Sequence, residues 1–209
     1  MPPRGPAYRI ETPRLVLRCW ALEDAVPLQA VLEEHIAELT PWLSWATREV
    51  GTLEQRVADL RRMRRRFDGD EDYGYGVFDR DSGEVVGGCG LHLRAGPGAR
   101  EIGYWVRPDR WGQGLATELS AALTRVAFEV DGVDRVDVRC DPANRASARV
   151  AEKLGYRHEA TLRVRLHAGD GSLRDAMIWS MLAAELPGSP AARLAAGIAA
   201  RDALGARLL

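Results

Sequence analysis

The sequence predicts a mixed α/β (α+β) fold in a single domain, and three observations support this prediction. With 209 residues, of which 46% are hydrophobic, the chain can bury a full core, and its length suits one domain or one domain with a short appendage. Short β-rich runs alternate along the chain with segments whose apolar residues recur at helical spacing. No repeat or interdomain linker precedes Leu186. We therefore expect one domain over residues 1–186 and a C-terminal helical tail over residues 187–209.

The first half of the chain is expected to hold two helices and a hairpin. The run "RIETPRLVLRCW" alternates apolar and polar residues and predicts the first strand, and a helix is expected from about residue 24 to 35. After the loop "LTPWLSWAT", Thr52 and Gln55 fit a capping box ahead of a second helix, whose apolar positions recur over residues 53–67. The run "YGYGVFDRDSGEVVGGCGLHLR" predicts a hairpin, because the Asp and Gly residues of "DRDSGE" are turn formers.

The second half repeats strand and helix patterns. A strand over residues 101–107 leads through a glycine-containing turn into a helix over residues 115–130. The run "RVDVRC" predicts a strand, residues 144–154 a helix, and "GYRHEATLRVRL" with "LRDAMIWSML" a closing hairpin. Ser189 and Pro190 form an N-cap and first-turn pair for an alanine-rich helix. This helix is expected either to make an oligomer contact, as in a homodimer, or to be a loosely held tail.

Composition excludes several classes of protein. The net charge of -1 gives no basic field for specific nucleic-acid binding. Cys19, Cys89 and Cys140 lie in apolar strand-like surroundings without a CxxC pair, so we expect reduced core residues. His158 and His167 lack a ligand-spaced partner, so no metal site is expected. The N-terminus has no signal-peptide pattern and no stretch approaches the ~20 apolar residues of a membrane helix, which predicts a cytoplasmic protein.

The turn within "EIGYWVRPDRWGQGLATELSAAL" is the strongest functional signal from the residues alone. A helix N-terminus offers unpartnered N–H groups and the positive end of the helix dipole, and Gly112 and Gly114 allow close approach of a phosphate. The geometry of a tight turn would also account for both glycines. A P-loop would need a lysine after its second glycine, and a dinucleotide fingerprint would need a third glycine where Thr117 stands.

This stretch, with the later "RVDVRCDPANRASARVAEKLGYRHEATLR", resembles the GNAT N-acetyltransferases of the RimJ/RimL type, which acetylate the N-termini of ribosomal proteins. The resemblance extends from "TPRLVLR" to "MIWSML" and includes "PWLSW". It implies a mostly antiparallel sheet of about seven strands, splayed at the acetyl-CoA site and flanked by about four helices. It also implies a metal-independent acyltransferase that uses acetyl-CoA as cosubstrate. A primary amine, which in this branch is a protein N-terminal α-amine, would attack the thioester directly.

In that family the turn binds the pyrophosphate of acetyl-CoA through backbone N–H groups. The wider superfamily has Arg or Gln where this chain has Trp111, so neighbouring Arg107 and Arg110 are expected to supply the missing charge. The cofactor-binding residues implied by the resemblance are Val106, Arg107, Trp111, Gly112, Gln113, Gly114, Leu115, Ala116, Thr117, Asn144 and Ser147.

Amine acetylation needs a group that deprotonates the acceptor and a group that protonates or stabilises the departing thiolate. The resemblance implies that Glu101 is the base, acting through water, and contacts the acceptor; the alternative is a solvated strand residue. An α-amine has an ordinary pKa of ~7.7–8.0 against ~10.4 for lysine, so it demands less of any base.

The helix after "RCDPA" is expected to supply the acid. Asn144 is a good N-cap, and the resemblance adds a contact with the pantetheine arm. Many GNAT enzymes have a tyrosine acid where this chain has Ala151, so Ser147, expected near the sulfur, is the favoured replacement. Tyr156 is either a fallback acid or a core residue. Cys140 invites an acetyl-cysteine proposal, but burial as a small apolar residue is the preferred interpretation.

Two further features leave alternatives open. Trp42 and Trp45 are either packing anchors or contacts in the acceptor groove, which the resemblance places beside their loop. The run "RRMRRR" is either a solvated helix face or part of a non-catalytic ribosome- or RNA-binding module. Among enzymes, the alternative is a small-molecule acetyltransferase acting on an aminoglycoside, a polyamine or an amino acid.

Overall fold

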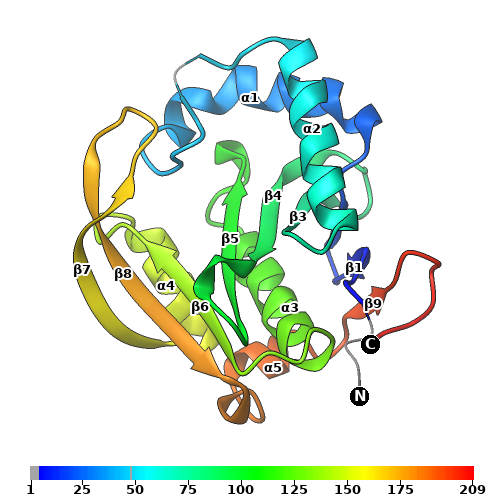
Figure 1. Ribbon diagram of the computed structural model, residues 1–209, viewed down its shortest axis with the longest axis vertical. Helices are drawn as coiled ribbons and strands as arrows, with labels where there is room; N and C mark the ends of the chain where they lie inside the picture. The colour runs from blue at the N-terminus through cyan, green and yellow to red at the C-terminus, as the bar shows by residue number, and fades with distance from the viewer. Residues whose placement is uncertain (1–4, 48) are drawn as a thin grey trace.

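The computed structural model describes residues 5–47 and 49–209. Its helices and strands follow in chain order (Figure 1): β1 (Arg9–Glu11), β2 (Leu15–Cys19), η1 (Leu22–Asp24), α1 (Ala25–Leu39), α2 (Leu53–Asp68), β3 (Tyr73–Asp79), β4 (Val85–His92), η2 (Leu93–Ala95), β5 (Ala99–Val106), η3 (Pro108–Arg110), α3 (Leu115–Glu129), β6 (Arg135–Cys140), α4 (Arg145–Leu154), β7 (Arg157–His167), β8 (Leu173–Leu182), η4 (Ala183–Glu185), α5 (Pro190–Leu194) and β9 (Ala199–Arg201). Here η marks a 3₁₀ turn.

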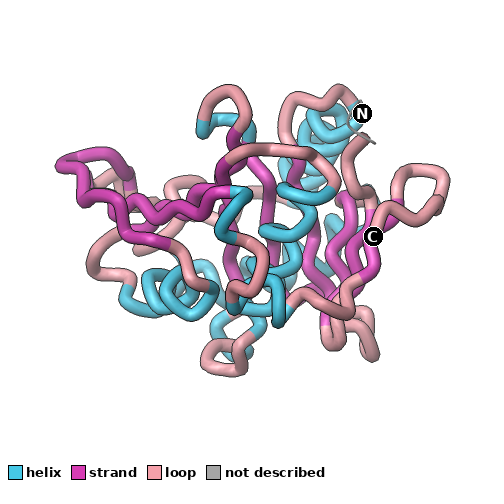
Figure 2. The backbone as a smooth tube through the Cα atoms, turned by 90° about the horizontal axis from the view of Figure 1, so that it is seen from below, coloured by secondary structure: helices cyan, strands magenta, loops and turns pink. Residues whose placement is uncertain are grey.

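The strands of the described residues form one nine-stranded sheet in the order β7-β8-β6-β5-β4-β3-β2-β1-β9. Every neighbouring pair is antiparallel except β5 and β6. Figure 2 shows the β7–β8 hairpin reaching out at one edge of the sheet. The fold is therefore the mixed, mostly antiparallel sheet that the sequence predicts.

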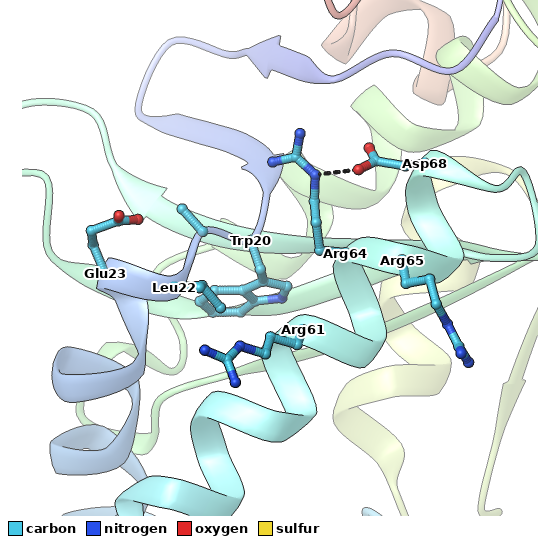
Figure 3. Close-up of a pocket in the computed structure, with 8 residues that line it drawn as sticks. Trp20, Leu22, Glu23, Arg61, Arg64, Arg65 and Asp68 are labelled. Carbon is cyan, nitrogen blue, oxygen red and sulfur yellow. Dashed lines mark hydrogen bonds and ion pairs between the residues drawn. The ribbon is translucent and has the colours of Figure 1, made fainter.

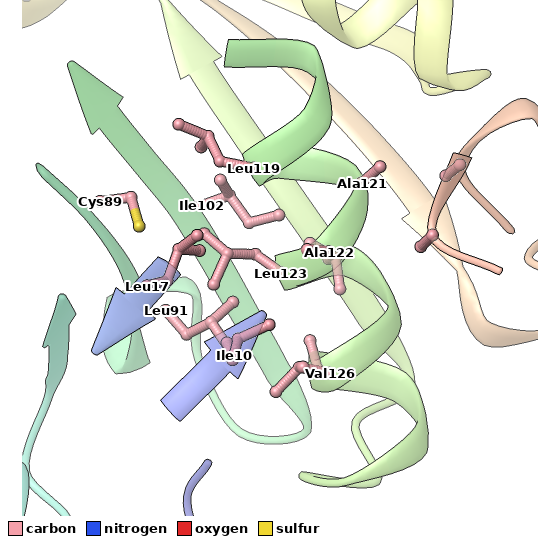
Figure 4. Packing of buried hydrophobic residues seen from close by; sticks show 14 of the residues in the cluster. Ile10, Leu17, Cys89, Leu91, Ile102, Leu119, Ala121, Ala122, Leu123 and Val126 are labelled. Carbon is pink, nitrogen blue, oxygen red and sulfur yellow. The ribbon is translucent and has the colours of Figure 1, made fainter. Parts of the chain in front are cut away.

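Helices cover both faces of the sheet, so it has two apolar cores. On one face, Leu119 and Leu123 of α3 pack with Leu17, Leu91 and Ile102 of the strands (Figure 4). On the other face, residues of α1 and α2 form a second cluster with residues of β2, β3 and β4. Each fully buried Leu or Ile contributes roughly 1.5–3 kcal/mol to the free energy of folding.

The burial of β2 on both faces of the sheet explains why its sequence is a run of apolar residues. Leu15 and Leu17 belong to the α3 core, whereas Val16 between them belongs to the α1–α2 core. Successive side chains of a strand point to opposite faces, so a strand that is covered on both sides reads as an apolar run.

The single parallel pair of strands ends early. β5 and β6 are paired from Ala99 opposite Arg135 to Ile102 opposite Val138, and no further. Beyond that point β5 continues beside β4 as far as Val106, while β6 continues beside β8 as far as Cys140. The turn before α3 follows β5 and the turn before α4 follows β6, so both helices begin at the end where the strands part.

Most predicted elements are confirmed, including the helices over residues 53–67, 115–130 and 144–154. The predicted first strand is instead two strands, β1 and β2, because Thr12 accepts a hydrogen bond from the N–H of Leu15 and closes a turn between them. This division and the added strand β9 raise the number from about seven to nine. The first helix also runs on past residue 35 to Leu39.

The C-terminal segment differs from the expected helical tail. Ser189 caps a helix as predicted, but that helix ends at Leu194, and β9 then pairs with β1 at the edge of the sheet. Ala191 and Ala200 are fully buried in the α3 core. Small apolar side chains permit this close packing, so the segment completes the domain core.

The buried C-terminal strand gives the first testable prediction. Ala200→Glu should lower the free energy of unfolding by at least about 2 kcal/mol, because it places an unpaired charge in the core. Leu204→Glu is the matched control, since Leu204 is 94% exposed, and it should change stability by no more than about 0.5 kcal/mol. Urea denaturation of both variants measures the difference. Equal stability would mean that the segment does not pack as described.

Candidate active site

The turn before α3 presents a concentration of free backbone donors. Gly112 and Gly114 have positive φ angles of 74° and 79°, which favour glycine, and Gly114 is the N-cap of α3. The backbone N–H groups from Gly112 to Thr117 make no hydrogen bond to any described residue. An added Cβ at Gly112 would meet no atom within 4 Å. With the positive end of the helix dipole, these donors form an anion-binding site.

A distant arginine holds this turn in place. The Nη1 atom of Arg14 donates to the carbonyl of Gln113 at 2.9 Å, and its Nε donates to Glu118 Oε2 at 2.7 Å. Thr12 completes the connection by donating to Glu118 Oε1 at 2.6 Å. Sequence reasoning missed Arg14, because no local spacing links the β1–β2 turn to the start of α3.

The two arginines expected to supply charge are both paired with carboxylates. Arg110 Nη2 lies 2.8 Å from Asp79 Oδ2, and Arg107 Nε lies 2.7 Å from Asp109 Oδ1. The hydrogen bond from Arg110, with a smaller contribution from the N–H of Ser82, lowers the pKa of Asp79 to about 2. Both arginines therefore have a structural role in tying the turn to its surroundings.

Trp111 covers the end of β5. Its indole Nε1 donates to the carbonyl of Val106 at 2.6 Å, so a strand carbonyl that β6 leaves unpaired gains a donor. About half of the Trp111 side chain remains exposed. This hydrogen bond gives a structural reason for Trp111 at a position where the wider superfamily has Arg or Gln.

A cavity of about 490 Å³ adjoins the turn. It brings Gly114 and Thr117 of the turn together with Lys153 and with the ion pair of Arg14 and Glu118. Lys153 comes from the last turn of α4, so the cavity connects the start of α3 with the end of α4. This combination of backbone donors and positive charge suits an extended phosphate-bearing ligand.

Two hydroxyl groups meet where β5 and β6 part. Tyr104 of β5 and Ser147 of α4 share a hydrogen bond of 2.9 Å between their side-chain oxygens. Asn144 accepts a hydrogen bond from the N–H of Ser147 at 3.0 Å, which confirms the predicted N-cap. Burial raises the pKa of Tyr104, so its hydroxyl keeps its proton at neutral pH. Sequence reasoning missed Tyr104, although it lies three residues after Glu101.

The other candidates on this side belong to the core. The hydroxyl of Tyr156 shares a 2.7 Å hydrogen bond with Thr124, both residues are buried, and Ala151 is buried as well. Burial raises the pKa of the Cys140 thiol, despite hydrogen bonds with Ser147 and Trp179 that lower it. A protonated thiol is a poor nucleophile, in keeping with the preferred interpretation of Cys140 as a buried apolar residue.

Glu101 lies on the opposite face of β5 and is only 4% exposed. Its Oε1 accepts hydrogen bonds from Arg94 at 2.9 Å and 2.5 Å, and its Oε2 lies 3.1 Å from Nε of Arg139. Burial lowers the pKa of Arg94, but the hydrogen bond and the charge of Glu101 raise it overall. Glu101 is therefore a buried, ion-paired carboxylate and not a solvated strand residue.

Aromatic side chains border the same face. The rings of Trp45 and Trp105 meet edge to face with centroids 5.9 Å apart, and Trp45 is 50% exposed. Trp105 shares its face of β5 with Glu101, because the two are an even number of residues apart. Trp45 is thus both packed on β5 and open to a ligand, while Trp42 is 40% exposed.

The β7–β8 turn braces this tryptophan loop. The N–H of Gly169 donates to the carbonyl of Thr40 at 3.0 Å. A Cβ at Gly169 would lie 2.1 Å from the carbonyl oxygen of Ala46, so only glycine allows this contact. Two segments far apart in the chain therefore bound the Glu101 face of the sheet.

The arginine run of α2 lines a separate hollow of about 380 Å³ beside Trp20 (Figure 3). Arg64 is paired with Asp68 at 2.8 Å, and Arg62 with Asp59 at 2.6 Å. Met63, expected in the apolar stripe of α2, is instead 43% exposed. These ion pairs favour a solvated helix face over a phosphate-binding surface.

Among residues 5–47 and 49–209, no cluster of three or more His, Cys, Asp or Glu side chains could hold a metal ion. In the same part of the chain, no helix is long and apolar enough to cross a membrane.

Comparison with known proteins agrees with this geometry. Residues 14–157 match the family model described as an acetyltransferase (GNAT) domain. Over 174 residues the chain is 27% identical to the uncharacterized N-acetyltransferase YoaA of Bacillus subtilis, covering 83% of this chain and 96% of that protein.

Solved structures show the same fold. Mycobacterium smegmatis RimJ, in complex with CoA-disulfide, superposes with a TM-score of 0.81 at 25% identity, over 94% of this chain and 97% of RimJ. RimL, a ribosomal L7/L12 alpha-N-protein acetyltransferase solved with coenzyme A, superposes with a TM-score of 0.73 at 19% identity, over 82% of this chain and 95% of RimL. The chain, with its splayed parallel pair and glycine turn, belongs to the GNAT family of acetyltransferases.

Proposed function

We propose that this acetyltransferase takes acetyl-CoA as its cosubstrate and transfers the acetyl group to a protein N-terminal α-amine. The observation that carries the cosubstrate assignment is the run of unpartnered N–H groups from Gly112 to Thr117, beside the point where β5 and β6 part. CoA supplies a pyrophosphate for such donors and a thioester for acyl transfer. RimJ and RimL, which share the fold, were solved with CoA groups bound.

The free edges of the parted strands suit the arm of CoA. Residues from Gly103 to Val106 have no partner in β6, so their backbone groups on that side, apart from the Val106 carbonyl that accepts from Trp111, are available to amide groups of a ligand. The turn would hold the pyrophosphate, with Lys153 adding positive charge in the adjoining cavity. Asn144 and Ser147, at the start of α4, border the same opening from β6.

The Tyr104–Ser147 pair is suited to the leaving group. Attack of an amine on a thioester forms a C–N bond and breaks the C–S bond, and the departing sulfur needs a proton or a hydrogen-bond donor. Ser147 would donate to the sulfur, and Tyr104 would in turn donate to Ser147, because both hydroxyls are protonated at neutral pH. The pair thus takes the place of the single tyrosine acid that is replaced by Ala151 in this chain.

The arginine side chains around Glu101 favour one kind of acceptor amine over another. Arg94 is 61% and Arg139 37% exposed in their side chains, and both lie at the carboxylate of Glu101. Exposed guanidinium groups repel a polycation, so an aminoglycoside or a polyamine suits this face poorly. A peptide N-terminus carries one amine and neutral backbone groups, which this face accommodates.

The acceptor is tested by incubating the protein with labelled acetyl-CoA and two peptides of the same sequence. One peptide has a free N-terminus and no lysine, and the other has a blocked N-terminus and one lysine, with spermidine as a third acceptor. We expect label on the free α-amine. Label only on lysine or spermidine would contradict the proposed acceptor, and no label from any amine would contradict amine acetylation.

The glycine turn yields a prediction about binding. Gly114→Glu should reduce acetyl-CoA affinity by at least ~100-fold, because a side chain and a negative charge would enter the site of the free N–H groups. Gly205→Glu is a matched control, since Gly205 also has a φ of 79° and open space at its Cβ. Calorimetric titration with acetyl-CoA should give wild-type affinity for the control. Equal affinity in both folded variants would contradict the phosphate site.

The hydroxyl pair yields a prediction about turnover. Ser147→Ala and Tyr104→Phe should each lower kcat by at least ~10-fold and leave acetyl-CoA affinity within a few fold, since the pair acts on the departing sulfur. Tyr156→Phe removes a hydroxyl that pairs with Thr124 in the core, so it should lower the melting temperature and not kcat. If Tyr156→Phe alone reduced kcat, the assignment of the acid would be wrong.

A further inference from the structure

A row of glycines crosses the Glu101 face of the sheet. Gly74 of β3 is opposite Gly90 of β4, and Gly90 is opposite Gly103 of β5. Gly103 is two residues from Glu101 and therefore shares its face. A Cβ at Gly74 would meet no atom within 4 Å. The glycines of this row carry no side chains of their own, so a neighbouring side chain can lie directly over the backbone.

One imidazole lies over this row. His92 is paired with Glu101 across β4 and β5, and its ring folds back over the glycines. A Cβ at Gly90 would lie 2.7 Å from Cε1 of His92, and a Cβ at Gly103 would lie 2.9 Å from Nε2. Both glycines are thus required by the ring. Gly103 is the first residue beyond the last β5–β6 pair at Ile102, so Nε2 is placed at the start of the opening.

A carboxylate fixes this ring. Nδ1 of His92 lies 2.9 Å and 3.1 Å from the two carboxylate oxygens of Asp72, which follows the C-terminal end of α2. Burial raises the pKa of Asp72, but hydrogen bonding to His92 and the charges of His92, Arg66 and Arg94 lower it overall. An ionised carboxylate at Nδ1 keeps the proton on that nitrogen and leaves the lone pair on Nε2.

Glu101 and His92, the two candidate bases, differ in whether an atom of the side chain is free to accept a proton from the amine. Oε1 of Glu101 accepts hydrogen bonds from Arg94, whereas Oε2 lies 3.1 Å from Nε of Arg139, is buried and makes no hydrogen bond to a described residue. Nε2 of His92 makes no hydrogen bond to any described residue, and 22% of the side chain is exposed. An incoming amine would therefore find an unpartnered nitrogen on the partly exposed side chain of His92, whereas the unpartnered oxygen of Glu101 is buried beside Arg139.

We propose that His92, oriented by Asp72, takes the proton from the acceptor amine, and that Glu101 is a positioning residue that holds Arg94 and Arg139. The proposal rests on the proposed function. The protonated amine gives one proton to Nε2, and its lone pair then forms the C–N bond. As the C–S bond breaks, the Tyr104–Ser147 pair gives a proton to the departing thiolate, the second proton of the nitrogen leaves to solvent, and the pair regains its proton from solvent. The imidazolium returns its proton to solvent.

The charged groups around His92 are Asp72 before β3, Arg66 on α2, Arg94 after β4 and Glu101 on β5. The base and the acid lie on opposite faces of β5, because Gly103 and Tyr104 are adjacent in a strand. Proton removal from the amine and proton delivery to the sulfur thus use groups from opposite faces of β5, which approach the thioester where β5 and β6 part.

Steady-state kinetics on the peptide with a free N-terminus test this proposal over pH 6–10. His92→Gln should lower kcat/KM by about 100-fold near pH 7. The loss should diminish from about pH 8 upward, because an α-amine that is already neutral needs no base. Acetyl-CoA affinity should stay within about twofold.

Glu101→Gln is the comparison. Because Glu101 is a positioning residue in this proposal, the loss of kcat/KM in this variant should be the same at every pH. A pH-dependent loss in Glu101→Gln with normal kinetics in His92→Gln would overturn the proposal.

A second measurement needs no acceptor. In ¹⁵N-histidine NMR spectra of the wild-type protein, assigned with His92→Gln, we expect the neutral imidazole to carry its proton on Nδ1. Asp72→Asn should shift the balance toward the other tautomer and also lower kcat/KM. A proton on Nε2 in the wild-type protein would overturn the dyad whatever the acceptor. Failure of the proposed function would instead appear as absence of acetyl-CoA binding, with the tautomer unchanged.

Discussion

The early end of the β5–β6 pair is the constraint on which the rest of the site depends. Parallel strands that stayed paired to their ends would satisfy one another's backbone groups and close the sheet. Here pairing stops at Ile102 and Val138, so the last residues of both strands lack partners on the facing side. Because α3 follows β5 and α4 follows β6, both helix N-termini lie at this opening.

The covering of both faces keeps the two strands apart. The α3 core holds β5 through Ile102 and Val106, and the same cluster holds β6 through Val138 and Cys140. Each strand is also hydrogen-bonded to a different antiparallel neighbour, β4 or β8. The opening is therefore a property of the strand pairing in the sheet.

The opening divides the chemistry between two faces. Tyr104 and Ser147 lie on the side of α3 and α4, whereas His92 and Glu101 lie on the side of α1 and α2. The period of two along β5 produces this division, since adjacent residues of one strand point to opposite sides. A single strand thus contributes side chains to both faces, and the acid and the base that we propose come from opposite faces.

Local sequence determined the elements and the glycine turn. Periodicity and capping residues such as Thr52 and Asn144 were enough to predict the helices, because these signals act within one or two turns. The turn at Gly112 and Gly114 could be predicted for the same reason, since positive φ angles and a helix N-terminus are local properties. The roles expected for the residues of the turn remain predictions.

Tertiary structure decided the contacts between segments far apart in the chain. Arg14 at the α3 turn, Tyr104 with Ser147 and Asp72 with His92 are brought together by strand register and helix packing, which no spacing in the sequence encodes. The C-terminal segment was expected to be helical from its alanine content, but edge pairing with β1 and burial in the core gave it a strand. Local propensity is worth at most about 1 kcal/mol per residue, and burial with strand pairing outweighs it.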